Sequence, residues 1–148
     1  MTIISAPTDS SIPHIPPPET LLSSHPASQL FDLTITRCTV NAVTIEFQAR
    51  DSAFADSGDL RAALGCVIDC AARLAARPAI GICSLLEQEL HFRAPCTATS
   101  FYVTAQIDSS SSRYALYQSA VYALGEHKPS LIADSQGTLL KQTQLTSQ

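Results

Sequence analysis

The sequence has few charged residues, almost no methionine and no tryptophan. Tryptophan is absent, methionine occurs once, and charged residues make up only 15% of the 148 residues, against roughly 25% in typical soluble domains. Hydrophobic residues reach 45%, so the chain can bury a core and is not disordered overall. This balance suggests one domain with part of its surface covered by a partner subunit.

Basic residues are also scarce. Only two of the nine basic residues are lysines, the formal net charge is −4, and the seven arginines are scattered along the chain. A nucleic-acid partner is therefore not expected. No uncharged apolar stretch reaches the length of about 18 residues that a membrane span needs, and the N-terminus MTIISAPTDS lacks the features of a signal peptide. We expect a cytoplasmic protein without a membrane partner.

Cysteine and histidine spacings indicate neither a disulfide framework nor a metal site. The five cysteines are an odd number and form no Cys-x-x-Cys pair, which fits a reduced compartment. The four histidines have no ligand spacing with the cysteines, so no metal is expected. Glycine-rich nucleotide loops and the Gly-x-Ser-x-Gly motif are absent as well.

Proline separates a leader from the rest of the chain. Six of the nine prolines lie in residues 1–30, and we predict an irregular leader over residues 1–25 followed by one domain over residues 26–148. Glu19 to Ser24 could form one or two helical turns before His25-Pro26 stops them.

Period-two patterning begins at Phe31. Apolar and polar residues alternate through Phe31 to Arg50, with a plausible turn at Asn41-Ala42, which predicts a β-hairpin.

A helix follows a polar loop. Between Leu60 and Ala76, thirteen of seventeen residues are apolar. Asp59 is a natural N-cap, and Arg77-Pro78 is expected to close the helix. A helix that is apolar on nearly every face must be surrounded by other elements.

The rest of the chain is predicted to be strand. Four segments alternate with turns: 84–94, 100–108, 113–124 and 131–140. We predict an α+β fold in which an antiparallel sheet, a hairpin followed by a four-strand meander, wraps around one central helix.

Three stretches in this order are similar to one known family. They are HPASQLFDLTI before and within the first strand, LGCVIDCAARLAA in the helix, and LEQELHFRAP in the next strand, followed by ADSQGTLL near the end. From about Pro26 to Thr138 the chain resembles the PaaI-like branch of the hotdog-fold acyl-CoA thioesterases. The resemblance implies the hotdog fold and chemistry on an acyl thioester.

Asp69 is the strongest candidate for catalysis because it is the only acid within the apolar helix. An aspartate there is costly to bury without a partner. The resemblance implies that this carboxylate faces the thioester across a dimer interface, as a general base or as a nucleophile. The alternative is an i,i+4 salt bridge to Arg73 or another structural role.

The start of the helix is the second candidate. The resemblance implies that backbone N–H groups near Arg61, Ala62 and Ala63 polarise the thioester carbonyl as an oxyanion site. Arg61 could instead bind a phosphate of coenzyme A or lie in solvent. Many members of the family carry His-Gly-Gly where this chain has Leu60-Arg61-Ala62.

Glu87, Glu89 and His91 alternate along the strand after the helix. Such a row is usually a solvated face. If it met a partner's helix, Glu87 or His91 could supply a second acid–base group.

The predicted function is hydrolysis of an acyl-CoA or acyl-carrier-protein thioester. Two alternatives remain: an accessory protein that binds acyl thioesters without hydrolysing them, and a dehydratase-type enzyme of the same fold. Coenzyme A or the carrier would enter as part of the substrate, with no separate cofactor. We expect a homodimer or a dimer of dimers, because the edges of such a sheet need cover.

Overall fold

The computed structural model describes residues 17–49, 57–94, 98–125 and 128–143. Residues 1–16 of the predicted leader and residues 50–56 of the loop before the long helix lie outside these ranges. In chain order the elements are α1 (Pro18–Ser24), α2 (Ala27–Leu30), β1 (Phe31–Thr39), β2 (Ala42–Ala49), α3 (Ser57–Ile80), β3 (Cys83–Phe92), β4 (Ser100–Ser110), β5 (Tyr114–Leu124) and β6 (Ser130–Lys141).

The six strands form one antiparallel sheet in the order β1-β2-β4-β5-β6-β3. The predicted hairpin is confirmed, with Phe31 paired to Ala49 and Thr39 to Ala42. The predicted meander is wrong in one respect, because β3 pairs with β6 and β4 pairs with β2. The period-two pattern shows which side of a strand is buried but not which strand lies beside it.

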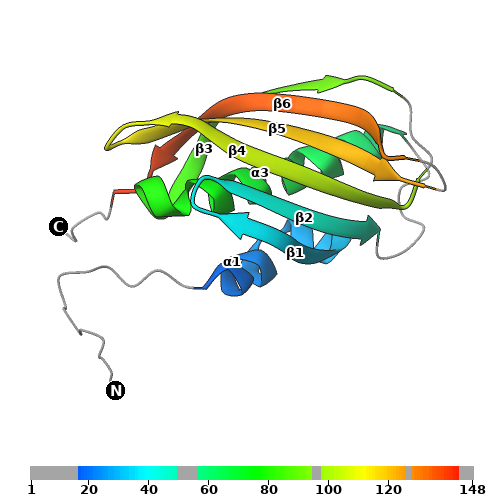
Figure 1. Cartoon of the computed structure of the whole chain (residues 1–148), viewed down its shortest axis with the longest axis horizontal. Coiled ribbons are helices and arrows are strands. Elements are labelled where there is room, and N and C mark those ends of the chain that lie inside the picture. The colour runs from blue at the N-terminus through cyan, green and yellow to red at the C-terminus, as the bar shows by residue number, and fades with distance from the viewer. Residues whose placement is uncertain (1–16, 50–56, 95–97, 126–127, 144–148) are drawn as a thin grey trace, which may run out of the picture.

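The sheet curves over α3, which runs along its inner face (Figure 1). The side of each strand that faces α3 is apolar, whereas the other side, which we call the outer face, is mostly polar and exposed. Small side chains on α3 let the sheet approach closely, since Ala71, Ala72, Ala75 and Ala76 are all fully buried. The expectation of a sheet around a surrounded helix is confirmed.

Both ends of α3 differ from the prediction. The helix begins at Ser57, so Asp59 lies inside its first turn rather than at the N-cap. It continues through Pro78 to Ile80 and ends at Gly81, whose φ is +76°. Glycine adopts this left-handed conformation readily, and its N–H bonds to the Arg77 carbonyl 2.9 Å away. A proline near the end of a helix did not stop it, and the glycine did.

The two short helices pack against α3 and β1. Leu22 of α1 and Ala27 of α2 are buried in the core. The packed unit therefore extends upstream of the predicted boundary at Pro26. None of the helices in the described ranges is both long enough and apolar enough to cross a membrane.

Aromatic and polar side chains meet under α3. Phe47 contacts Phe31 edge-on, with ring centroids 4.9 Å apart, and stacks on Phe101 at 5.1 Å. Tyr117 is buried, accepts a hydrogen bond from Gln88 Nε2 at 3.1 Å, and lies 3.2 Å from Ser135 Oγ.

Tyr117 can lie across the sheet because residue 137 is a glycine. A Cβ on Gly137 would stand 2.7 Å from Tyr117 Cε2 and would also clash with the Glu87 carbonyl oxygen. The backbone of β3 and a buried ring therefore both occupy the space that a side chain would need.

We predict that Gly137→Ala lowers the free energy of unfolding by about 1–3 kcal/mol, the usual range for overpacking a core. Gly125→Ala is the matched control, because a Cβ there would meet nothing within 4 Å. Urea denaturation measures both variants. Equal stability of the two would contradict the close approach at Gly137.

Candidate active site

Asp69 lies in the middle of α3, on the side that faces the short N-terminal helices. Its side chain is only 14% exposed. Two cationic side chains bind the carboxylate. The Nε2 of His25 is 2.8 Å from Oδ2, and the Nε of Arg73 is 3.0 Å from both Oδ1 and Oδ2. We call these three residues the Asp69 cluster.

Arg73 also ties the cluster to the sheet. Its Nη1 donates a hydrogen bond to the carbonyl oxygen of Cys83, at the start of β3, over 3.0 Å. The i,i+4 salt bridge that the sequence left open as an alternative is therefore present. It is one part of a larger network that joins α3, β3 and the segment between α1 and α2.

The network keeps Asp69 ionised. Burial opposes the charge, but the hydrogen bonds from His25 and Arg73, together with their charges, outweigh burial and lower the pKa of Asp69 below its ordinary value. The carboxylate is thus an anion at neutral pH, with two cations beside it.

His25 is charged for the reciprocal reason. Burial opposes its charge, yet the hydrogen bond and charge of Asp69, with a smaller contribution from Cys66, raise the pKa of His25 to about 9. The backbone N–H of Ala27 points at Nδ1 from 3.1 Å, which favours the neutral ring instead. Asp69 outweighs this contact because its full negative charge attracts the imidazolium, whereas the Ala27 N–H contributes only a dipole.

No pattern in the sequence indicated that His25 belongs to the site. It precedes Asp69 by 44 residues, and the dipeptide His25-Pro26 indicated only the end of a short helix. Only the docking of the N-terminal helices on α3 brings the two together.

The cysteines of this region divide into two groups. Burial raises the pKa of Cys70 to about 12 and that of Cys83 to about 11. Both are therefore protonated at neutral pH and act as apolar side chains of the core. Cys66 is partly exposed, lies on the same side of α3 as Asp69, and contributes to the raised pKa of His25.

The predicted oxyanion residues do not hold free amides. Because α3 begins at Ser57, the N–H groups of residues 57–59 are among those without a helical partner, and the helical hydrogen-bond ladder begins with the N–H of Leu60. The amides of Arg61, Ala62 and Ala63 lie within the helical hydrogen-bond ladder. Ala63 is buried, and the guanidinium of Arg61 lies over the ring of Phe92, 4.7 Å from its centroid.

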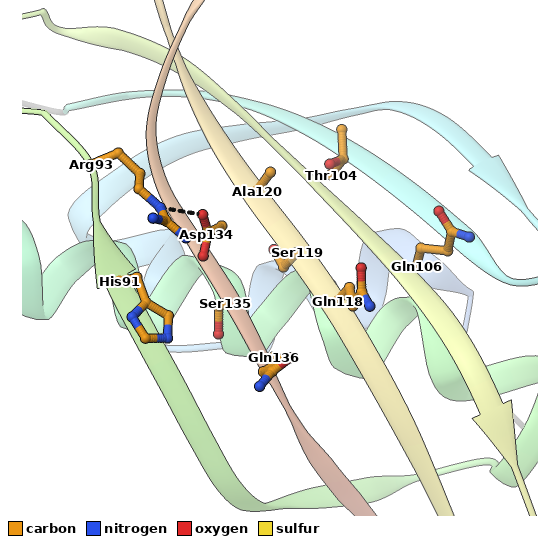
Figure 2. Close-up of a pocket in the computed structure, with 10 residues that line it drawn as sticks. All are labelled: His91, Arg93, Thr104, Gln106, Gln118, Ser119, Ala120, Asp134, Ser135 and Gln136. Atoms are coloured by element: carbon orange, nitrogen blue, oxygen red, sulfur yellow. Dashed lines mark hydrogen bonds and ion pairs between the residues drawn. The ribbon is translucent and has the colours of Figure 1, made fainter.

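Glu87 and His91 lie on the outer face, on the other side of the sheet from Asp69. His91 borders an open polar groove with Arg93 and Asp134, which form an ion pair at 2.6 Å, and α3 lies behind the sheet (Figure 2). His91 Nε2 contacts Glu89 at 2.9 Å. One chain therefore does not bring Glu87 or His91 to Asp69, because the sheet separates them.

A metal centre has no support among the described residues, which contain no group of three or more His, Cys, Asp or Glu side chains placed to hold an ion. The Asp69 cluster offers instead a permanent carboxylate that can attack or orient an electrophile. It also offers an adjacent cation that can donate a proton.

We predict that the His25–Asp69 pair stabilises the fold in a pH-dependent way. The pKa of His25 is higher in the folded chain, so its contribution is complete below pH 6.5 and disappears as the pH rises through about 9. His25→Gln should lower the free energy of unfolding by about 2 kcal/mol at pH 6 and by much less at pH 10. Urea denaturation from pH 6 to 10 tests this, and a pH-independent difference would contradict it.

Comparisons with known proteins agree at the level of structure. No family model matches the sequence, and no curated protein matches it. Among solved structures, a thioesterase family protein from Silicibacter pomeroyi is 16% identical, with a TM-score of 0.75 over 83% of this chain and 93% of that one. The PaaI protein of E. coli is 11% identical, with a TM-score of 0.73 over 84% of this chain and 90% of that one.

A hypothetical thioesterase from Streptococcus pneumoniae, solved with coenzyme A, is also similar. It is 10% identical, with a TM-score of 0.65 over 80% of this chain and 93% of that one. At such identities the likeness concerns the fold. The chain has the hotdog fold, and thioesterase-superfamily structures, PaaI included, share its architecture.

Proposed function

We propose that this protein hydrolyses an acyl thioester and that Asp69 is its catalytic carboxylate. The observation that carries the proposal is a charged carboxylate held in the middle of the central helix of a hotdog fold, under a short helical segment that could cover a substrate. The structural neighbours named as thioesterases support the same reaction class.

The ionised state of Asp69 favours a role as nucleophile over a role as general base. A carboxylate whose pKa is lowered is a weak base towards water, but it is always in the anionic form that a nucleophile needs. Attack on the thioester carbonyl would form an acyl anhydride with Asp69 and release the thiolate. His25, charged and 2.8 Å away, would donate the proton to the departing sulfur. Water would then hydrolyse the anhydride.

The N–H groups that stabilise the oxyanion cannot come from the α3 helix that carries the attacking Asp69. Asp59, the last residue with a free amide, lies ten residues before Asp69, or about 15 Å along the helix axis at 1.5 Å per residue. One helix therefore cannot present both groups to one carbonyl. The free amides of residues 57–59 can serve the Asp69 of a second copy, so we propose a site completed by two subunits.

The sheet has two edge strands and an exposed apolar patch against which a second copy can pack. Its two edge strands, β1 and β3, each lack a neighbour on one side. Exposed apolar side chains gather where β3 begins, β5 begins and β6 ends: Ile82, Leu86, Tyr114, Leu116 and Leu140 are 40–62% exposed. An exposed patch of this kind marks an interface. We propose a homodimer that can pair further into a dimer of dimers.

We further propose acyl-CoA as the substrate, because one structural neighbour was solved with coenzyme A. An acyl carrier protein would present the same thioester. In either case the carrier is part of the substrate, and no separate cofactor takes part.

Two observations favour a second candidate function, an accessory protein that binds thioesters without hydrolysis. His25 and Arg73 already bind the Asp69 carboxylate. Leu60-Arg61-Ala62 stands where many PaaI-like enzymes carry His-Gly-Gly. Both features would suit a protein that retains the binding surface and has lost the reaction. The dehydratase alternative has no comparable support.

We predict that Asp69→Asn lowers acyl-CoA hydrolysis by about 10²-fold or more, because the amide keeps the volume and loses the nucleophile. Release of free thiol from a panel of acyl-CoA esters measures it. Arg73→Gln is the matched control, since it breaks the salt bridge but leaves the carboxylate, and should be milder. Equal losses in the two variants would assign Asp69 to structure, and hydrolysis retained by Asp69→Asn would exclude it from catalysis.

We also predict an obligate oligomer. Sedimentation at micromolar concentration should give at least a dimer, because the exposed apolar side chains beside β3 need cover. Leu86→Glu, at the most exposed of them, should shift the equilibrium towards the monomer. A stable, folded, active wild-type monomer would exclude the shared site.

A further inference from the structure

A bulge in β3 decides which of its polar side chains faces α3. The pairing of β3 with β6 shifts between Leu85 and Glu87, where Leu86 is an extra residue. Leu85 packs against the core before the bulge and Gln88 is partly buried after it, whereas Glu87 is exposed. Without the bulge, strict alternation would turn Glu87 inward instead. The bulge therefore turns an uncharged amide towards α3.

A buried tyrosine holds the amide of Gln88. The Nε2 of Gln88 donates a hydrogen bond to the Tyr117 hydroxyl at 3.1 Å, and that hydroxyl lies 3.2 Å from the Oγ of Ser135, which is also buried. The Oε1 of Gln88 faces α3, where it would lie 3.5 Å from a Cβ on Gly65. None of the described residues donates a hydrogen bond to this Oε1. The amide thus presents one fixed acceptor to the space beside Gly65.

Gly65 leaves a gap next to that acceptor. A Cβ there would make only ordinary contacts, 3.5 Å from Gln88 Oε1 and 3.7 Å from Leu90 Cδ2. Alanine would therefore fit, and it suits a helix interior better than glycine does. Packing does not explain the glycine. A water molecule within hydrogen-bond distance of Oε1 would take about the same place as the Cβ.

The gap lies beside Asp69. Gly65 and Asp69 are four residues apart on α3, so they share one side of the helix, with Cβ positions about 5–6 Å apart. Arg73, one turn further on the same side, bonds to the start of β3, so the strand follows this side of the helix. Burial raises the pKa of Tyr117, and the charge of Asp69 adds to this shift. The carboxylate therefore lies within electrostatic range of the hydroxyl that holds Gln88.

We propose that Gln88 is a positioning residue of the hydrolysis, whose Oε1 holds the water that attacks the acyl group on Asp69. This inference rests on the proposed function, in which His25 gives its proton to the departing sulfur and becomes neutral. The water donates one hydrogen bond to Oε1 and its other proton to His25. Its oxygen forms a bond to the acyl carbon, and the bond from that carbon to the Asp69 oxygen breaks. The free carboxylic acid leaves, and the Asp69 carboxylate and the charged His25 are restored.

Rapid mixing with the acyl-CoA ester that the wild type hydrolyses fastest tests the proposal. Gln88→Leu should release about one thiol per active site in a burst and then turn over at least about tenfold more slowly, because only the second step loses its positioned water. Intact mass spectrometry should find the acylated chain accumulating in this variant. Gln118→Leu, the same substitution at an exposed position of the outer face, is the matched control and should behave as the wild type.

Two further variants separate positioning from a structural role. Gln88→Glu keeps an acceptor oxygen in the place of Oε1 and should recover part of the second step. Gly65→Ala fills the gap and tests the same point if Gln88→Leu does not fold. It should raise the urea midpoint, because alanine suits the helix better, and still slow the second step by at least about tenfold.

The outcomes distinguish this inference from the proposed function. If the wild type hydrolyses thioesters and a folded Gln88→Leu keeps the wild-type turnover, or slows without a burst and without an acylated chain, the role of Gln88 is overturned and the proposed function stands. Wild-type turnover in Gly65→Ala would also overturn that role. If the wild type hydrolyses no ester of the panel, the proposed function is refuted, and this inference with it.

Discussion

A negative charge in the middle of an apolar helix is the constraint on which the rest of this structure depends. Asp69 cannot lie unpaired on a helix surrounded by other elements, because burial of an isolated carboxylate is too costly. Arg73 comes from the same helix, but His25 must come from elsewhere. The N-terminal helices are therefore held against α3 by the same ion pair that holds the candidate nucleophile.

This dependence links stability and chemistry at one place. The two cations that offset the cost of burying the Asp69 carboxylate also lower its pKa. Asp69 therefore stays ionised and is a poor proton acceptor. The side chains of His25 and Arg73 also line the neighbouring cavity. A change at any member of the cluster therefore affects both the docking of α1 and α2 and the charge of Asp69.

The sheet divides the protein into two chemically distinct sides. The inner side, with α3, carries the buried carboxylate and the small side chains that allow close packing. The outer face carries Glu87, Glu89 and His91, whose ion pair and hydrogen bonds are exposed. Neighbouring residues of a single strand thus belong to different sides of the sheet. His91 and Asp69 lie on opposite sides, so one chain does not combine them in catalysis.

The sequence by itself determined most of the elements, the buried side of each strand and the single acid of the apolar run from Leu60 to Ala76. These follow from local periodicity and composition, which depend only on residues close in the chain. The order of the strands, the partner of β3 and the meeting of His25 with Asp69 depend on contacts between residues far apart in the chain. No local pattern encodes those contacts. Only the packing of α1 and α2 on α3 decided that a histidine in a proline-rich leader would neutralise a carboxylate 44 residues away.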